Sequence, residues 1–179
     1  MRKLTTNELN RVSLDQYQSI IKLPVVIVLD NIRSQNNIGS IFRTADAFLI
    51  QEIHLCGITA TPPHREIHKT ALGATDSVTW KYYADSVDSV KELKMNGFTL
   101  YGVEQTDQSL SLEQFSITTS AKIALVFGNE VEGIEERIIQ LVDNCIEIPQ
   151  FGTKHSLNVS VAAGIIIWEV FKKMAANLR

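Results

Sequence analysis

Three segments of the chain combine glycine with polar side chains where apolar, strand-like runs end. They read DNIRSQNNIGSIFRTAD from residue 30, LVFGNEVEGI from residue 125 and IEIPQFGTKHSLNVSVA from residue 146. Glycine has no Cβ and lets a backbone approach a ligand closely, while amide, hydroxyl and guanidinium groups can bind polar ligand atoms. Because ligands of open α/β folds bind at the carboxyl edge of the sheet, these segments predict a ligand site there.

The first segment also predicts where one arginine lies. A stripe of apolar residues at helical spacing indicates the core face of a helix: Ile38, Ile41, Phe42, Ala45 and Leu49. At about 100° per residue, Arg43 lies roughly opposite this face and above Gly39 and Ser40. Since helical side chains lean toward the N-terminus, its guanidinium is expected to reach toward the strand-to-helix loop. The alternative is a solvated surface arginine.

The elements that must position these segments alternate between strands and helices. The predicted strands are Val25 to Leu29, Ile53 to Cys56, Val78 to Tyr83, Thr99 to Val103, Ile123 to Phe127 and Cys145 to Ile148. This order predicts an α/β fold, a mostly parallel sheet with helices on both faces. A last helix from about Leu157 is apolar nearly all round, so it is expected to be central or buried in a subunit interface.

Composition narrows the classes of protein. Cys56 and Cys145 are far apart with no CxxC pair, which argues against a disulfide framework or a zinc site and for a reducing compartment. The N-terminus does not resemble a secretory signal, and the longest apolar run is too short to span a bilayer, so we expect a cytoplasmic protein. A net charge of -3 argues against indiscriminate adhesion to nucleic acid, but leaves room for a local basic patch.

Several familiar fingerprints fail. The chain has no GxGxxG and no GxSxG, so dinucleotide-binding and Ser/His/Asp hydrolase functions lack support. GNEVEG has the outer glycine spacing of a P-loop, but Ile134 and Glu135 occupy the places of the required Lys and Ser/Thr. His64 and His68 occur in HREIH rather than HExxH, so we expect no metal site and two solvated histidines.

In this order and at these separations, the three segments resemble the motifs of the SpoU/TrmH branch of the SPOUT RNA methyltransferases. The match runs from Leu29 to Glu169, and SLNVSVA after Ile-Pro is its most specific part. The resemblance implies a C-terminal trefoil knot, S-adenosyl-L-methionine as the cofactor bound by that knot, and a homodimer with the cofactor site beside its interface. The implied domain covers residues 24–179, with a helical N-terminal extension over residues 1–23.

The resemblance also assigns a cofactor site. The residues of this implied site are Gly128, Asn129, Glu130, Gly133, Ile148, Pro149, Gln150, Ser156, Leu157 and Asn158. Glycines after a strand would let the backbone approach an adenosine, and Ile148 and Leu157 could sandwich its adenine. In the alternative interpretation, Gly128 and Gly133 are only turn glycines and Ser156 is a helix N-cap.

The catalytic residues that the resemblance implies are Asn37, Arg43, Glu130, Ser156 and Asn158. Relatives are thought to use the arginine as the base for a ribose 2'-hydroxyl, which is difficult for a group with a pKa above about 12. We expect Arg43 instead to bind a phosphate bidentately and stabilise the developing alkoxide. The proton acceptor stays open. Gln150 replaces a frequent Met and Asn36 a frequent Gly, which could alter cofactor contacts and loop geometry.

The expected partner is RNA rather than DNA, and the sequence does not distinguish tRNA from rRNA. Candidate RNA contacts are Arg2, Lys3, Arg11, Arg33, Arg65, Lys69 and Lys154. For each of them the alternative is a solvated surface charge, which is the usual state of charged residues. Two other functions stay open: a catalytically inactive knotted RNA-binding or assembly factor, and a base methyltransferase. The complete set of presumed catalytic residues argues against the first, and the arginine in the first segment favours ribose over base.

Overall fold

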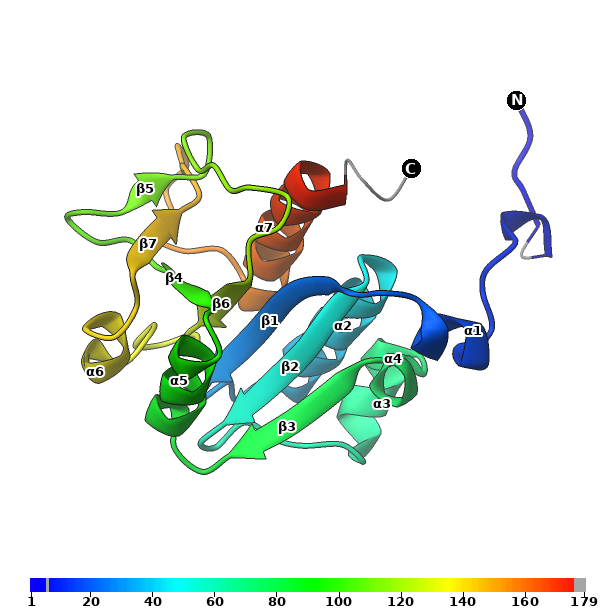
Figure 1. Ribbon diagram of the computed structural model, residues 1–179, viewed down its shortest axis with the longest axis horizontal. Helices are drawn as coiled ribbons and strands as arrows, with labels where there is room; N and C mark the ends of the chain where they lie inside the picture. Colours follow the sequence, from blue (N-terminus) through cyan, green and yellow to red (C-terminus); the bar gives the residue numbers. More distant parts are fainter. Residues whose placement is uncertain (6, 176–179) are drawn as a thin grey trace.

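A seven-stranded sheet forms the centre of the computed structural model, which describes residues 1–5 and 7–175 (Figure 1). The strand order is β3-β2-β1-β6-β4-β7-β5, and every neighbouring pair is parallel. The strands are β1 Leu23–Asp30, β2 Ile50–Cys56, β3 Thr79–Tyr83, β4 Thr99–Val103, β5 Leu110–Ser111, β6 Ile123–Phe127 and β7 Asn144–Glu147. The predicted parallel sheet is confirmed.

The strand predictions differ from the structure mainly at the ends. β4 and β6 have the predicted bounds, and β2 begins at Ile50 rather than Ile53. β7 ends at Glu147, so Ile148 lies in the following loop. The prediction missed β5, because its two residues lie in a polar stretch that shows no alternation.

Helices cover both faces of the sheet, as predicted. On one face α2, α3, α4 and α7 contribute to a large apolar cluster, and on the other α5 and α6 contribute to a smaller one. The helices are η1 Asn7–Leu9, α1 Leu14–Ser19, α2 Gln35–Ala47, α3 Arg65–Ala71, α4 Ala74–Ser77, α5 Ser86–Met95, α6 Glu136–Ile139 and α7 Val159–Met174.

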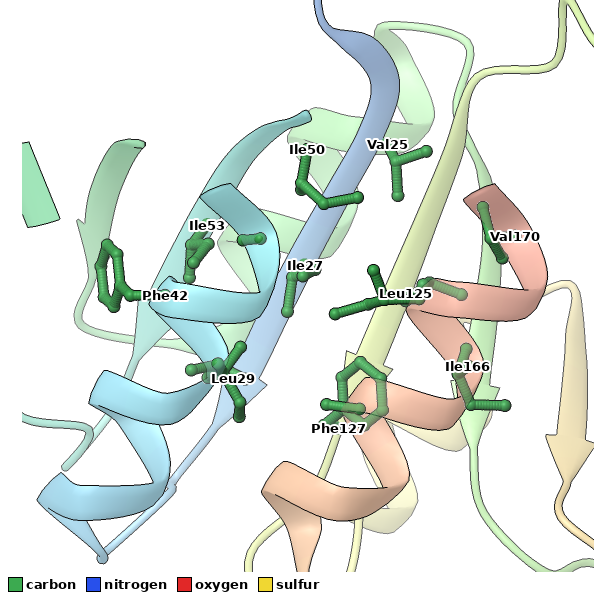
Figure 2. Close-up of a cluster of buried hydrophobic side chains, with 14 of the residues drawn as sticks. Val25, Ile27, Leu29, Phe42, Ile50, Ile53, Leu125, Phe127, Ile166 and Val170 are labelled. Carbon is green, nitrogen blue, oxygen red and sulfur yellow. The ribbon is translucent and has the colours of Figure 1, made fainter. Parts of the chain in front are cut away.

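The burial of strand β1 explains why its sequence is a continuous apolar run. Val25, Ile27 and Leu29 point into the larger cluster, and Val26 and Val28 into the smaller one. Figure 2 shows the first three beneath α2 and α7, beside side chains of β2 and β6. A strand buried on both faces needs no polar alternation.

Helix α2 buries the predicted stripe. Ile38, Ile41, Phe42 and Ala45 are fully buried against the sheet. The helix begins after Ser34, whose hydroxyl accepts a hydrogen bond from the Asn37 amide, and it ends at Ala47. The prediction was wrong for Leu49, which lies beyond the helix with a φ of 54°.

Helix α7 is covered on one side only. Val159, Ala163, Ile166, Ile167 and Val170 are buried. On the opposite side Val161, Ile165 and Trp168 are 51%, 37% and 48% exposed. The helix is therefore not central within one chain, which leaves a subunit interface as the remaining interpretation of its apolar surface. None of the described helices is both long and apolar enough to cross a bilayer.

Candidate functional site

The ends of four neighbouring strands, β1, β6, β4 and β7, bring the three segments together. A cavity of about 760 Å³ lies at this edge of the sheet. All predicted cofactor residues except Pro149 line it: Gly128, Asn129, Glu130, Gly133, Ile148, Gln150, Ser156, Leu157 and Asn158. Pro149 instead borders a smaller depression with Phe151 and Glu169. We call the larger space the strand-edge cavity.

The second segment folds into a closed turn on one wall of the strand-edge cavity. The backbones of Asn129 and Gly133 exchange two hydrogen bonds of 3.1 Å, and the Asn129 side chain accepts two more from Val131 and Glu132. Gly133 has a φ of 71°, so it is a turn glycine, as the alternative interpretation held. Gly128 is required for another reason, because a Cβ there would lie 2.0 Å from the Gly133 carbonyl carbon.

A polar network joins the three segments at the cavity. The Asn37 side-chain NH₂ group donates to the Glu130 carboxylate at 2.9 Å, and the Asn158 side-chain NH₂ group donates to the Asn37 side-chain oxygen at 3.2 Å. Asn158 is also the N-cap of α7, since its side-chain oxygen accepts a hydrogen bond from the Ser160 backbone amide at 2.9 Å. The alternative that Ser156 caps this helix is therefore wrong. Ser156 lines the cavity instead.

Arg43 is not part of this arrangement within one chain. It lies on the exposed side of α2, as the helical stripe predicted, but it does not line the strand-edge cavity. It follows the first helical residue, Gln35, by eight positions, which places it about 12 Å along the axis at 1.5 Å per residue. That rise agrees with its absence from the lining of the cavity.

The loop after β4 contributes residues that the sequence analysis missed. The Glu104 carboxylate accepts hydrogen bonds from the Ile134 amide at 3.2 Å and the Gln105 amide at 3.0 Å. The Gln105 side chain donates to the His155 carbonyl oxygen at 3.0 Å. This loop therefore ties the second segment to the third. The strand before this loop, β4, was predicted from the sequence. That prediction was the available signal, because it places the loop at the same edge of the sheet as the second and third segments.

A buried carboxylate anchors the two motif loops from beneath. Asp30, at the end of β1, is fully buried and accepts a hydrogen bond from the Glu135 amide at 3.2 Å. The Asn31 side chain donates to both Asp30 and Glu135 carboxylates, at 2.9 and 2.7 Å. Burial raises the pKa of Asp30. Asp30 and Asn31 belong to the first segment, but no pattern in that segment indicated this anchoring role.

The strand-edge cavity is acidic. Its lining includes the carboxylates Glu104, Glu130, Glu132, Glu136 and Glu147 and contains no lysine or arginine. None of these carboxylates forms an ion pair within the described residues. Such a cavity favours a ligand that carries positive charge.

The candidate RNA contacts lie outside this cavity. Arg33, Arg65, Lys69 and Lys154 are exposed, as are the N-terminal basic residues. Arg2 pairs with Glu8 at 2.6 Å, and this contact lowers the pKa of Glu8 to about 2.

His64 caps α3 by accepting a hydrogen bond from the Glu66 backbone amide. No cluster of three or more potential metal ligands occurs within residues 1–5 and 7–175.

Comparisons with known proteins agree with this geometry. The profile of the SpoU rRNA Methylase family matches residues 24–168. A TrmH family tRNA/rRNA methyltransferase of Staphylococcus aureus is 30% identical over 151 residues, which are 84% of this chain and 60% of the relative. The tRNA (guanosine(18)-2'-O)-methyltransferase of Thermus thermophilus is 31% identical over 145 residues, 81% of this chain and 73% of the relative. The chain thus spans less than two thirds of the staphylococcal relative.

Solved structures share the fold. The TrmH/SpoU tRNA modifying enzyme of A. aeolicus superposes with a TM-score of 0.80 over 92% of this chain and 82% of its own, at 24% identity. The AdoMet-bound rRNA methyltransferase of Sinorhizobium meliloti gives a TM-score of 0.77 over 87% of this chain and 59% of its own, at 26% identity. The profile match over most of the chain shows that this chain belongs to the SpoU methylase family, and the cavity formed by its second and third segments agrees with this assignment.

Proposed function

We propose that the chain transfers a methyl group from S-adenosyl-L-methionine to a ribose 2'-hydroxyl of tRNA or rRNA. The main observation is that the second and third segments line one acidic cavity, and that Asn37 of the first segment is hydrogen-bonded to Glu130 and Asn158 in its wall. Similarity to enzymes named as tRNA and rRNA methyltransferases supports the proposal. Residues 24–179 would form the knotted methyltransferase domain, and residues 1–23 an extension.

The residues of the strand-edge cavity fit the cofactor. Its carboxylates suit a ligand with sulfonium and ammonium groups, and Ile148 and Leu157 offer apolar surface for an adenine. S-adenosylmethionine, when bound, supplies an electrophilic methyl group. The turn closed by Asn129 and Gly133 brings backbone amides and carbonyls to the cavity wall, and Ser156 adds a hydroxyl.

The remaining residues would act on the RNA. Arg43 would bind a phosphate through its planar guanidinium and stabilise negative charge on the attacking oxygen. Asn37, Glu130 and Asn158 would fix the mouth of the cavity, because their hydrogen bonds leave each side chain little freedom. Holding the hydroxyl in line with the methyl group supplies much of the remaining rate enhancement.

A second copy of the chain is the proposed partner of α7. Val161, Ile165 and Trp168 form one exposed apolar face, and Trp168 stacks on Phe171 at 5.9 Å between ring centroids. Helix α2, with Arg43, packs beside α7. Because Arg43 lies outside the cavity of its own chain, we propose that it acts at the cavity of the second copy in a homodimer.

The dimer should depend on the α7 face. Ile165→Asp would place a charge in the apolar contact, so the variant is expected to be monomeric by sedimentation at a concentration where the wild type is dimeric. Met95→Asp is the control, since Met95 is also exposed, at 81%, but lies on α5 on the other face of the sheet. A dimer that survives Ile165→Asp and dissociates with Met95→Asp would place the interface elsewhere.

Cofactor binding should stabilise the fold. Ligand at about 100 times its Kd adds roughly 2.7 kcal/mol to the free energy of unfolding. Leu157→Asp should abolish the resulting rise in Tm, because it adds a further carboxylate at the proposed adenine surface. Leu157 is 38% exposed, so the variant should fold. A full shift in the folded variant would show that the cofactor binds elsewhere.

Nucleoside mass spectrometry of RNA from cells with and without the protein tests the whole proposal. Loss of one 2'-O-methyl nucleoside is expected. A methyl group on ribose also makes the adjacent phosphodiester resistant to alkali. Methylated RNA that alkali cuts at every position would identify a base methyltransferase, and no change in any nucleoside would favour an RNA-binding assembly factor.

A further inference from the structure

We propose that a second cavity, lined by residues of α3, α4 and β3, binds one unstacked nucleobase of the RNA substrate, with Arg65 at an adjoining phosphate. This inference rests on the proposed RNA methyltransferase function. The cavity has a volume of about 600 Å³, within the usual range for small-molecule sites. We call it the Trp80 cavity.

The walls of the Trp80 cavity suit a flat aromatic ligand. The ring of Trp80 and those of Pro62 and Pro63 supply apolar surfaces, and Ile67 also lines the cavity. A nucleobase removed from its stack presents two apolar faces, and proteins commonly cover such faces with aromatic side chains. The shape and chemistry of these walls therefore match a base.

Trp80 is anchored and yet accessible. It lies in β3, where it pairs with Ile53 of β2, and part of its side chain packs against the main apolar core. β3 is the edge strand of the sheet, so no further strand covers it within the described part of the chain. The indole is half-buried and lines the cavity with its remaining surface. A rigid ring of this kind loses little conformational entropy when a base stacks on it.

Polar groups around the walls match the rest of a nucleotide. Asp76 and Thr75 of α4 offer a carboxylate and a hydroxyl to the polar edge of a base. The Arg65 side chain is 94% exposed, and its only ion pair among the described residues, with Glu66, is a long 4.0 Å. Its guanidinium is therefore available for a phosphate, which it can bind through two parallel hydrogen bonds.

The position of the Trp80 cavity connects it to the proposed active site. The Thr70 hydroxyl of α3 donates to the Asn36 carbonyl oxygen at 3.0 Å, one residue before Asn37. A Cβ on Gly39 would lie 2.3 Å from the Ile67 carbonyl oxygen, so α2 and α3 are in backbone contact. Because Ile67 of α3 both meets α2 and lines the cavity, the cavity lies close to α2. Its base would thus belong to a nucleotide near the methylated one.

Three variants test the inference. Trp80→Ala should raise the KM for RNA about 10-fold, since stacking on an aromatic side chain is worth about 1–3 kcal/mol per base. Trp80→Phe should retain most of the affinity. Arg65→Gln should weaken RNA binding and reduce its salt dependence by about 0.7 log units per decade for one lost single-stranded phosphate contact. In all three, kcat and the cofactor-induced rise in Tm should stay as in the wild type.

Lys91→Gln is the matched control for charge removal, because Lys91 is exposed on α5, on the other face of the sheet. Stacking has its own signal: RNA should quench indole fluorescence in the wild type and less so in Trp80→Phe, which retains Trp168. Unchanged RNA affinity in both Trp80→Ala and Arg65→Gln would overturn the inference and leave the proposed function intact. A wild-type protein that neither binds nor methylates RNA would overturn both.

Discussion

Arg43→Ala should lower the rate of methyl transfer by about two orders of magnitude or more, while the protein stays folded and retains its cofactor-induced rise in Tm. The fold should survive because Arg43 is exposed on α2 and the helix is held by Ile38, Ile41 and Phe42. The rate should fall because removing a group that stabilises developing negative charge typically costs this much. Single-turnover assays with saturating RNA measure the effect.

Arg43→Lys distinguishes two ways of binding the phosphate. Lysine keeps the positive charge but lacks the planar pair of donors, so a bidentate clamp predicts a large loss in this variant too. Near-complete activity of Arg43→Lys would show that a point charge is sufficient and would contradict the bidentate clamp. Near-complete activity of Arg43→Ala would show that Arg43 has no role in catalysis.

Mixing two inactive variants shows which cavity Arg43 serves. A heterodimer of Arg43→Ala and Leu157→Asp chains contains one intact cavity and one intact Arg43, on different chains. If Arg43 acts across the dimer, this mixture should regain activity when the subunits exchange. If it acts within its own chain, the mixture should stay inactive.

Much of the fold was predictable because β1, β6 and α2 have strong local patterns of apolar residues. Continuous apolar runs identified strands buried on both faces, and the stripe from Ile38 to Ala45 identified the buried side of α2. Short elements gave no such signal. β5 is two residues long, and α6 four, so neither has enough turns or alternations to establish a period.

The candidate site was predictable as a set of segments but not as a set of contacts. The second and third motifs contain most residues of the cavity wall after β6 and β7. They did not identify Glu104 and Gln105, whose positions follow from β4 lying between β6 and β7 in the sheet. Strand order depends on long-range packing, which local patterns do not encode.

Arg43 is a second example of what local sequence patterns do not predict. The helical stripe correctly predicted its exposed side of α2, but direction around a helix says nothing about distance along it. In the structure the residue is too far along α2 to line the cavity of its own chain.

Gly128→Ala should eliminate cofactor binding more completely than any side-chain truncation in the cavity. The new Cβ would lie 2.0 Å from the Gly133 carbonyl carbon and 2.1 Å from the Ile134 amide nitrogen, and both are backbone atoms. The turn would have to open, which would break the two hydrogen bonds between Asn129 and Gly133. We expect a loss of about 1–3 kcal/mol in the free energy of unfolding, which is typical of overpacking.

The cofactor response separates a local effect from general instability. The rise in Tm with S-adenosylmethionine should disappear in Gly128→Ala, because the displaced turn forms a wall of the cavity. Gly152→Ala is the matched control: a Cβ there meets no atom within 4 Å, and its φ is not in the left-handed region. It should retain the wild-type Tm and the full cofactor response. If Gly128→Ala responded as fully as Gly152→Ala, the closed turn after β6 would not be part of the cofactor site, and the acidic cavity would need another ligand.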